Sequence, residues 1–331
     1  MSANTLTPRF SLSWARIIKD GDGEINQEGL DHYSKMIDKL LEANIEPFIT
    51  LFHWDLPYAL YKKGGWLNRD ITQAFKKYVE AVVDAFGHKV NHFITFNEPQ
   101  CILGARLGGT LPDAKYSAKD RNTMVHNLLL CHGEAVKVLR KCKNIKIGYA
   151  PCNDARIPLT TSVEDIEAAR QSYFDVERGD MWGVSVFSDP IILGDYPKKY
   201  YEVNRKEDLP DIKDGDLELI SQPIDFYCQN IYQGLYVKAD GKGGYQIVPP
   251  KPNVFVFFTH FFQILKLNFL LVFMARYCQV ACYVLYSPKA GIFCTHGAFH
   301  ILTHYRFALG CYLLGCPAPI WSAAHPLNVC H

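Results

Sequence analysis

The chain has 331 residues, of which 48% are hydrophobic, with 35 basic and 34 acidic side chains. This length is enough for one large domain or two modest domains with a buried core. The formal net charge of +1 excludes the basic excess that is typical of a protein whose main partner is nucleic acid.

The even charge balance conceals an abrupt change in composition near residue 250. All 34 acidic residues lie in 1–250, together with 30 basic residues, whereas 251–331 contains no Asp or Glu and five basic residues. The second segment also holds six of the 11 Cys and six of the 12 His. Because charged groups normally cover the surface of a globular domain, we predict two units of different origin, 1–250 and an apolar tail, 251–331.

The N-terminal residues and the cysteines of the first unit indicate a compartment. MSANTLTPRF has no basic stretch followed by an apolar run, so no secretory signal is predicted. The five cysteines of 1–250 show no paired spacing that suggests a disulfide framework. We therefore expect a cytoplasmic protein.

Strand-like runs alternate with amphipathic helices along residues 9–250. The predicted strands are 9–13, 46–52, 91–96, 145–149 and 224–228, and the predicted helices have apolar side chains recurring within 30–41, 71–86 and 125–139. This alternation is typical of a parallel sheet with helices packed outside it.

Polar residues directly follow several of the predicted strands. His53 follows the run that ends in Phe52, Asn97 and Glu98 follow the run that ends in Phe96, and Asn230 follows Cys228. Active sites of closed βα barrels are built at the carboxyl ends of several strands. No glycine-rich phosphate loop follows any strand, which disfavours a nucleotide-binding sheet. We therefore predict a (β/α)8 TIM barrel.

Glu98, in the run TFNEP, is the candidate catalytic residue. A carboxyl that is partly desolvated at a barrel mouth is suited to general acid/base chemistry, and the Asn97 amide beside it is suited to a sugar hydroxyl. His53 and Trp54, in FHWDLP, could contact the hydroxyls and the apolar face of a pyranose ring. Each of these residues has a purely structural alternative, and their shared position at strand ends favours the functional interpretation.

These motifs resemble those of the glycoside hydrolase family 1 β-glycosidases, in particular the β-glucosidases and 6-phospho-β-glucosidases. The resemblance runs in family order through RFSLSWARI, TLFHWDLP, GGWLNRD, TFNEP, SDPIILGDYP and IDFYCQNIY, and it covers nearly all of 9–250.

The resemblance implies a barrel that hydrolyses β-glycosides with retention of configuration, without a metal or organic cofactor. Glu98 matches the acid/base, and His53 and Asn97 match residues that bind the glycone, with Asn97 at the 2-hydroxyl. Other matched positions of the pocket are Arg9 and Tyr232, which surround and orient the nucleophile, and Asn230.

Two departures from the family pattern bear on activity. The chain begins at what would be strand two of the barrel, and the Thr-Glu-Asn-Gly motif that carries the nucleophile on strand seven does not occur. Retaining hydrolysis requires two carboxyl groups about 5 to 5.5 Å apart. We therefore expect an incomplete barrel, about strands two to six, with no nucleophile.

The tail after residue 250 allows several interpretations. The 22 residues of 254–275 have the length of a membrane helix, although Lys266 and Asn268 lie near the middle. His296, His300 and His304 have helical spacing but lack an established metal-binding motif. A frameshift or intron read-through would also produce an apolar segment without family motifs.

The sequence thus predicts a β-glycosidase-like protein, acting on β-glucosides or 6-phospho-β-glucosides, whose turnover is low or nil. A non-catalytic carbohydrate-binding remnant and a membrane-tethered pseudoenzyme are the alternative interpretations.

Overall fold

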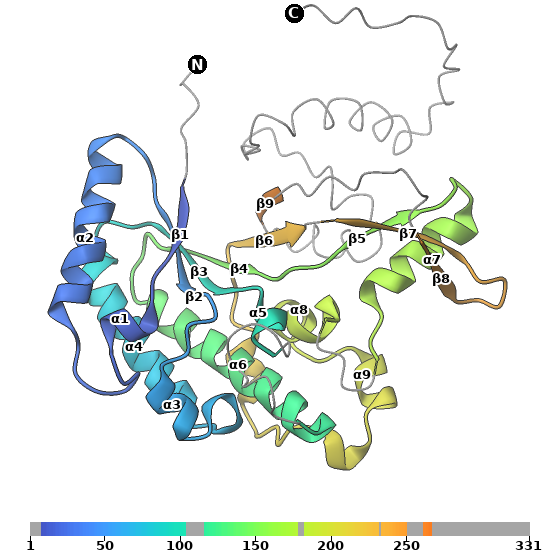
Figure 1. Cartoon of the computed structure of the whole chain (residues 1–331), viewed down its shortest axis with the longest axis horizontal. Coiled ribbons are helices and arrows are strands. Elements are labelled where there is room, and N and C mark those ends of the chain that lie inside the picture. Colours follow the sequence, from blue (N-terminus) through green and yellow to red (C-terminus); the bar gives the residue numbers. More distant parts are fainter. Residues whose placement is uncertain (1–7, 104–115, 178–181, 232, 250–260, 267–331) are drawn as a thin grey trace, which may run out of the picture.

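A computed structural model describes residues 8–103, 116–177, 182–231, 233–249 and 261–266. Within these residues the main sheet contains, in spatial order, β1 (Arg9–Ser11), β2 (Phe48–Phe52), β3 (His92–Asn97), β4 (Lys146–Ala150), β6 (Phe226–Ile231) and β9 (Phe261–Lys266). The strands β1, β2, β3, β4 and β6 are parallel neighbours in chain order, as Figure 1 shows.

The five predicted barrel strands are therefore confirmed, with bounds that differ by a few residues. Neighbouring strands are joined by helical crossovers, so their carboxyl ends meet at one edge of the sheet. The parallel sheet has the architecture of an incomplete (β/α)8 barrel, as predicted.

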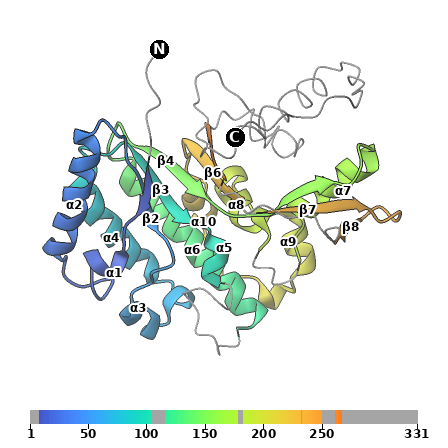
Figure 2. The same ribbon diagram turned by 45° about the horizontal axis from the view of Figure 1, so that its top comes forward.

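Helices cover one face of this sheet (Figures 1 and 2). The three predicted helices are confirmed as α2 (Gln27–Glu42), α4 (Ile71–Phe86) and α6 (Ala118–Leu139), and α4 packs along α6. The other helices are α1 (Trp14–Ile17), α3 (Tyr58–Lys62), α5 (Pro99–Leu103), α7 (Val163–Phe174), α8 (Val184–Leu193), α9 (Lys198–Val203) and α10 (Asp216–Ile220), with 3-10 turns η1 (Gly65–Leu67) and η2 (Lys206–Asp208).

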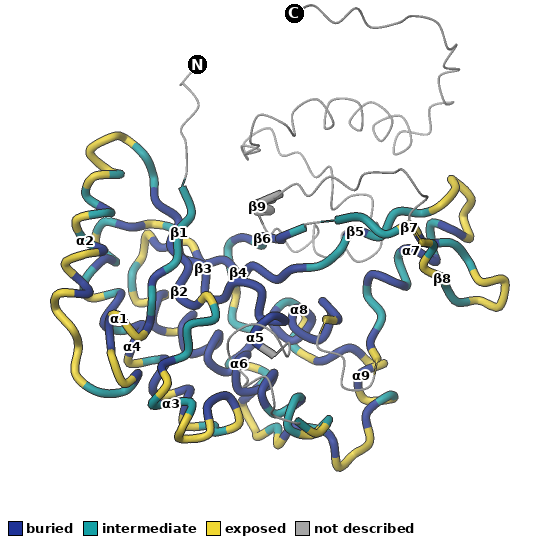
Figure 3. The backbone as a smooth tube through the Cα atoms, viewed as in Figure 1, coloured by how far each residue is buried: buried dark blue, intermediate teal, exposed yellow. Residues whose placement is uncertain are grey.

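The core lies between the sheet and these helices, where the backbone in Figure 3 is dark blue. All five residues of β2 are buried, because apolar side chains on one face meet the helices and those on the other face point into the barrel. Trp14 lies fully buried between Phe75 and Tyr78, with ring centroids 5.2 and 5.4 Å away. This aromatic cluster fixes the start of α1 against α4.

A small second sheet, which was not predicted, projects beside the main one. It consists of β5 (Ala155–Pro158), β7 (Gly234–Ala239) and β8 (Tyr245–Val248), in the order β5-β7-β8. Helix α7 packs on it through Ala168 and Ala169, which contact Val237. In Figure 1 this unit lies to the right of the strands that carry the candidate site.

Residues 261–266 correct one interpretation of the tail. They form β9, which pairs antiparallel with β6, so a continuous membrane helix over 254–275 is wrong for these six residues. The strands of a βα barrel are all parallel, so β9 does not take the place of a barrel strand. The other residues of 254–275, and His296, His300 and His304, lie outside the described residues. Among the helices that are described, none has the length and apolar character needed to cross a membrane.

Candidate active site

Polar side chains from four strands meet at the carboxyl edge of the main sheet. Arg9 comes from β1, His53 follows β2, Asn97 ends β3, and Asn230 lies in β6. Glu98 follows Asn97 directly, and both are only 2% exposed. The parallel register brings these residues together although they span more than 200 positions of the chain.

A hydrogen-bond chain fixes the orientation of Asn97 and His53. Arg9 Nη2 donates to Asn97 Oδ1 over 2.5 Å, so the Asn97 amide nitrogen faces His53 Nε2, 3.0 Å away. Because an amide N–H only donates, His53 Nε2 accepts, and its Nδ1–H donates to Ser11 Oγ over 2.8 Å. Loss of hydration and the nearby Arg9 guanidinium lower the pKa of His53, so the neutral ring that this pattern requires is favoured.

Asn230 connects this chain to the carboxyl group. Its Nδ2 donates to Asn97 Oδ1 over 3.0 Å and to Glu98 Oε1 over 2.5 Å. Arg9 Nη1 lies 3.5 Å from Asn230 Oδ1, and Arg9 Nε donates to Thr50 Oγ1 over 2.8 Å. Arg9 thus contacts both amide side chains, and one of them, Asn230, in turn holds the Glu98 carboxyl group.

The backbone at Glu98 leaves the sheet in an uncommon conformation. Its φ is +42°, in the left-handed region that residues other than glycine rarely adopt. Trp54 also lies in this region, with a φ of +75°. Glu98 N–H donates to Ala150 O over 2.7 Å, and the Trp54 indole N–H is shared between the carbonyl oxygens of Asn97 and Glu98, at 3.1 and 3.2 Å. Such conformations persist where surrounding contacts enforce them, and they cluster at functional sites.

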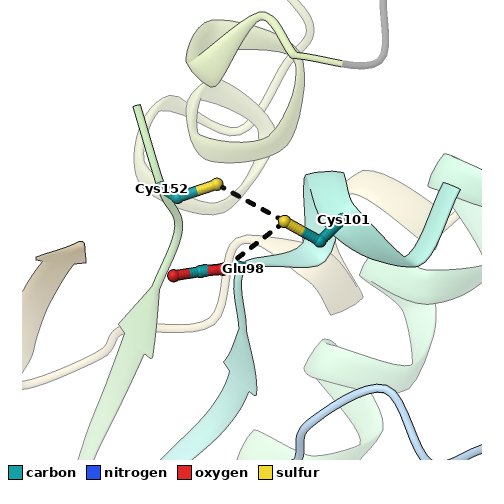
Figure 4. Close-up of side chains that lie close together, drawn as sticks. All are labelled: Glu98, Cys101 and Cys152. Atoms are coloured by element: carbon teal, nitrogen blue, oxygen red, sulfur yellow. Dashed lines mark hydrogen bonds between the residues drawn. The ribbon is translucent and has the colours of Figure 1, made fainter. Parts of the chain in front are cut away.

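Two cysteines lie on the other side of the same carboxyl group (Figure 4). Cys101 Sγ donates to Glu98 Oε2 over 3.4 Å and lies 3.9 Å from Cys152 Sγ. Gln100 binds the backbone of Cys152 with both ends of its amide, Nε2 to O at 2.8 Å and Oε1 to N at 3.3 Å. The start of α5 is thereby tied to the loop after β4.

The structure places most of the predicted site residues in one cluster. Arg9, His53, Asn97, Glu98 and Asn230 are joined by the hydrogen bonds above. The half-buried ring of Trp54 stands edge-on to His53, with centroids 4.8 Å apart, and its N–H binds backbone rather than facing outward. Tyr232 lies outside the described residues.

The neighbouring residues that contact this cluster and hold it in position were not predicted from the sequence. These are Ser11, Thr50, Gln100, Cys101 and Cys152. The only local indication was that Cys101, just after the TFNEP motif, follows Glu98 by three residues, about one helical turn.

A parallel βα sheet that gathers a carboxyl group, two amides, an imidazole and a guanidinium at its carboxyl edge has the fold of a βα barrel, in which active sites lie at that edge. The sequence model of Glycosyl hydrolase family 1 matches residues 3–253, and the chain belongs to this family.

Characterised relatives agree with this assignment. The chain is 44% identical over 235 residues to a 1,4-β-D-glucan glucohydrolase of Thermotoga neapolitana, covering 70% of this chain and 53% of the relative. It is 35% identical over 243 residues to a 6-phospho-β-galactosidase of Clostridium acetobutylicum, covering 70% of this chain and 50% of the relative. The chain thus spans about half the length of the curated relatives that it matches.

Solved structures show the same relation. A family 1 β-glucosidase from Thermotoga maritima in complex with isofagomine lactam superposes with a TM-score of 0.63 at 38% identity. The match covers 74% of this chain and 55% of that enzyme. The same enzyme in complex with deoxynojirimycin gives a TM-score of 0.62.

Proposed function

We propose that the cluster at the carboxyl edge of the sheet binds the glycone of a β-glycoside and that Glu98 protonates the oxygen of the leaving group. The observation that carries this proposal is the Glu98 carboxyl group itself, 2% exposed and held at Oε1 by Asn230. A buried carboxyl group in a fixed position is the arrangement that proton transfer to a leaving oxygen requires. The complexes of the related β-glucosidase from Thermotoga maritima with isofagomine lactam and with deoxynojirimycin support the same substrate class.

Asn97 and His53 are the proposed contacts to sugar hydroxyls. Asn97 is locked by Arg9 on one side and by His53 on the other, so a hydroxyl would meet an amide whose orientation is already set. His53 is exposed and can exchange its bond to Ser11 for a bond to substrate. Trp54 supports the Asn97–Glu98 backbone through its N–H, and its ring is the proposed apolar contact beside His53.

The second half of the proposal is that this chain completes the reaction slowly or not at all. Retaining hydrolysis needs a second carboxylate about 5 to 5.5 Å from the first to attack the anomeric carbon. Residues 251–331 contain no Asp or Glu, and the family's Thr-Glu-Asn-Gly motif is absent from the sequence. The chain would therefore keep the proton donor while lacking the nucleophile.

An added small nucleophile tests both halves in one experiment. The purified chain is incubated with phenyl β-glucoside and with sodium azide. Azide would attack the anomeric carbon from the α face, the bond from that carbon to the phenolic oxygen would break, and the phenol would leave with the Glu98 proton. The expected product is α-glucosyl azide, identified by nuclear magnetic resonance, with little hydrolysis when azide is omitted.

Two variants separate the roles in this experiment. Glu98→Gln should lower azide-dependent turnover of phenyl β-glucoside by about 10²- to 10⁴-fold, the usual contribution of a general acid. The same substitution should lower the turnover of dinitrophenyl β-glucoside much less, because the dinitrophenolate leaving group needs no proton. Glu218→Gln, at an exposed position on α10, is the matched control and should behave like the parent.

The outcomes distinguish the alternatives. Rapid hydrolysis without azide, with retained configuration, would overturn the missing-nucleophile half of the proposal. Binding of isofagomine lactam without any azide product would favour a non-catalytic carbohydrate-binding remnant. A parallel assay with phenyl 6-phospho-β-glucoside tests the second substrate class, which the similarity to a 6-phospho-β-galactosidase brings into consideration.

A further inference from the structure

The carboxyl group of Glu98 and the thiols of Cys101 and Cys152 converge on one small volume, as Figure 4 shows. One ligand atom from each of the three buried residues lies within 4.8 Å of the other two. The two cysteines are each 5% exposed. We propose that these three side chains form a binding site for a thiophilic divalent cation, with Zn²⁺ as the ion that fits best.

The spacing of the ligand atoms matches a tetrahedral zinc site. Zinc–sulfur bonds of about 2.3 Å and zinc–oxygen bonds of about 2.0 Å place two sulfurs about 3.8 Å apart, and a sulfur about 3.5 Å from an oxygen. The corresponding distances here are 3.9 Å between the two Sγ atoms and 3.4 Å between Cys101 Sγ and Glu98 Oε2. The remaining pair, Cys152 Sγ and the Glu98 carboxylate, lies within 4.8 Å.

The fold holds these residues in place before any cation binds. The left-handed φ of Glu98 turns the chain so that Cys101 N–H donates to Glu98 O over 2.9 Å, which puts Cys101 one turn above the carboxyl group. Cys152 is fixed by Gln100 and by an isolated parallel bridge to Asn230. A site whose ligands are already positioned loses little conformational entropy on binding.

The two oxygens of Glu98 have different neighbours. Asn230 donates to Oε1, whereas Oε2 faces the cysteines. A hydrogen bond to the outer oxygen orients a ligating carboxylate and is a usual support of metal sites. Gln100 Oε1 lies 3.7 Å from Cys152 Sγ, and water is the proposed fourth ligand.

Binding converts two thiols to thiolates, which releases two protons to solvent for each zinc bound, and a third proton leaves Glu98 when its carboxyl group is protonated beforehand; no bond is oxidised or reduced. A disulfide is a different outcome, because it requires an oxidant and a sulfur–sulfur distance of about 2.05 Å rather than the 3.9 Å found here. A cation at this position would occupy the Glu98 carboxylate and block its proton transfer, a consequence that rests on the proposed function. The binding itself does not.

The test uses cobalt(II) chloride as a spectroscopic probe of thiolate ligation, followed by zinc chloride in competition, with a reducing agent present. The full chain is used after replacement of the six cysteines of residues 251–331 by serine, so that the thiols counted belong to the family 1 segment. We expect a thiolate-to-cobalt charge-transfer band that one equivalent of zinc removes. Histidines of the tail cannot produce this band, since it arises from sulfur.

Matched cysteine variants locate the site. Cys101→Ser and Cys152→Ser should each weaken cobalt binding at least about tenfold, as expected when a supporting or ligating group is lost. Cys131→Ser, at a buried cysteine on α6, should leave the affinity unchanged. Circular dichroism verifies that each variant retains its helices. Equal cobalt affinity in all three variants would overturn the proposal.

A second measurement needs no substitution in the site. The unmodified chain is alkylated with iodoacetamide with and without zinc chloride, and each cysteine is followed by peptide mass spectrometry. Zinc should slow the alkylation of Cys101 and Cys152 together, at least about tenfold, and should not change Cys142. Unchanged rates at Cys101 and Cys152 would refute the site. Because neither assay uses a glycoside, a failure here is distinguishable from a failure of the proposed catalytic role.

Discussion

Asp55 provides a direct test of how burial controls charge next to the candidate site. It belongs to the FHWDLP motif, and its Oδ2 accepts the backbone N–H of Trp14 over 2.8 Å at the start of α1. Burial raises the pKa of Asp55 from 3.8 to about 6, because the charged form is poorly solvated there. The replacement Asp55→Asn keeps an oxygen that can accept from Trp14 and removes the titrating group.

The sign and size of the effect follow from linkage. Since the folded chain holds the Asp55 proton more tightly than the unfolded chain, the stabilisation from that proton is complete below pH 3.8 and is lost as the pH rises through 6. A displacement of about 2 pH units corresponds to at most about 3 kcal/mol of unfolding free energy. The variant does not titrate, so its stability relative to the parent should increase by up to this amount between pH 4 and pH 7.

Urea unfolding at several pH values measures this difference. Both proteins are unfolded at pH 4, 5, 6 and 7, and the free energy of unfolding of the parent is subtracted from that of Asp55→Asn at each pH. The subtraction cancels every other titrating group that the two proteins share. Asp214→Asn, at an exposed position, is the control and should give a flat difference. A flat or falling difference for Asp55→Asn would refute the assignment of a buried, proton-binding carboxyl group.

Three further substitutions test the packing around the site by urea unfolding at pH 7. Gly148→Ala on β4 should cost about 1–3 kcal/mol, because the added methyl group would overlap the ring of Phe226 on β6, and an unchanged midpoint would contradict this packing. Asp216→Asn should cost about 1.5–3 kcal/mol, since it removes the charge from a buried carboxylate that is hydrogen-bonded to the partly exposed Arg69, and a loss below 1 kcal/mol would argue against the pair. Ser117→Ala should cost about 1 kcal/mol through loss of the capping box of α6, whereas Ser117→Thr should retain most of the stability.

The strands and helices of the barrel could be predicted because their patterns are strong and local. The run Phe48–Phe52 is apolar except for Thr50, as is typical of a strand buried on both faces, and the stripe of α4 from Ile71 to Phe86 is buried at every predicted position. The predictions were less accurate at element ends. Leu41, which was predicted to lie on the apolar stripe of α2, is 36% exposed because the last turn of this helix extends beyond the buried core.

The small sheet was missed because its strands are short and half-exposed. The burial of β7 and β8 is mixed, so no continuous apolar run marks them. The available signal was the glycine-rich turn between them, in which Gly241 and Gly243 have φ values of +73° and +90°. Such a turn between two alternating runs is typical of a β-hairpin.

The candidate site divides in the same way into parts that can be predicted and parts that cannot. His53, Asn97, Glu98 and Asn230 could be grouped because the carboxyl ends of parallel strands meet. Cys101 and Cys152 could not, because they are 51 positions apart and neither has a metal-binding spacing. Their meeting depends on the turn at Glu98 and on the Gln100 bridge, which are tertiary features.

The turn at Glu98 therefore bears on both of the proposed chemistries. At this left-handed residue, one carboxylate oxygen accepts from Asn230 and the other accepts from Cys101, beside Cys152. A proton donor needs that carboxyl group to be protonated before catalysis, whereas a cation ligand needs it to be ionised. Since one carboxyl group cannot satisfy both requirements together, cation binding and proton donation at Glu98 must exclude one another, and the Asn230 hydrogen bond serves whichever form is present.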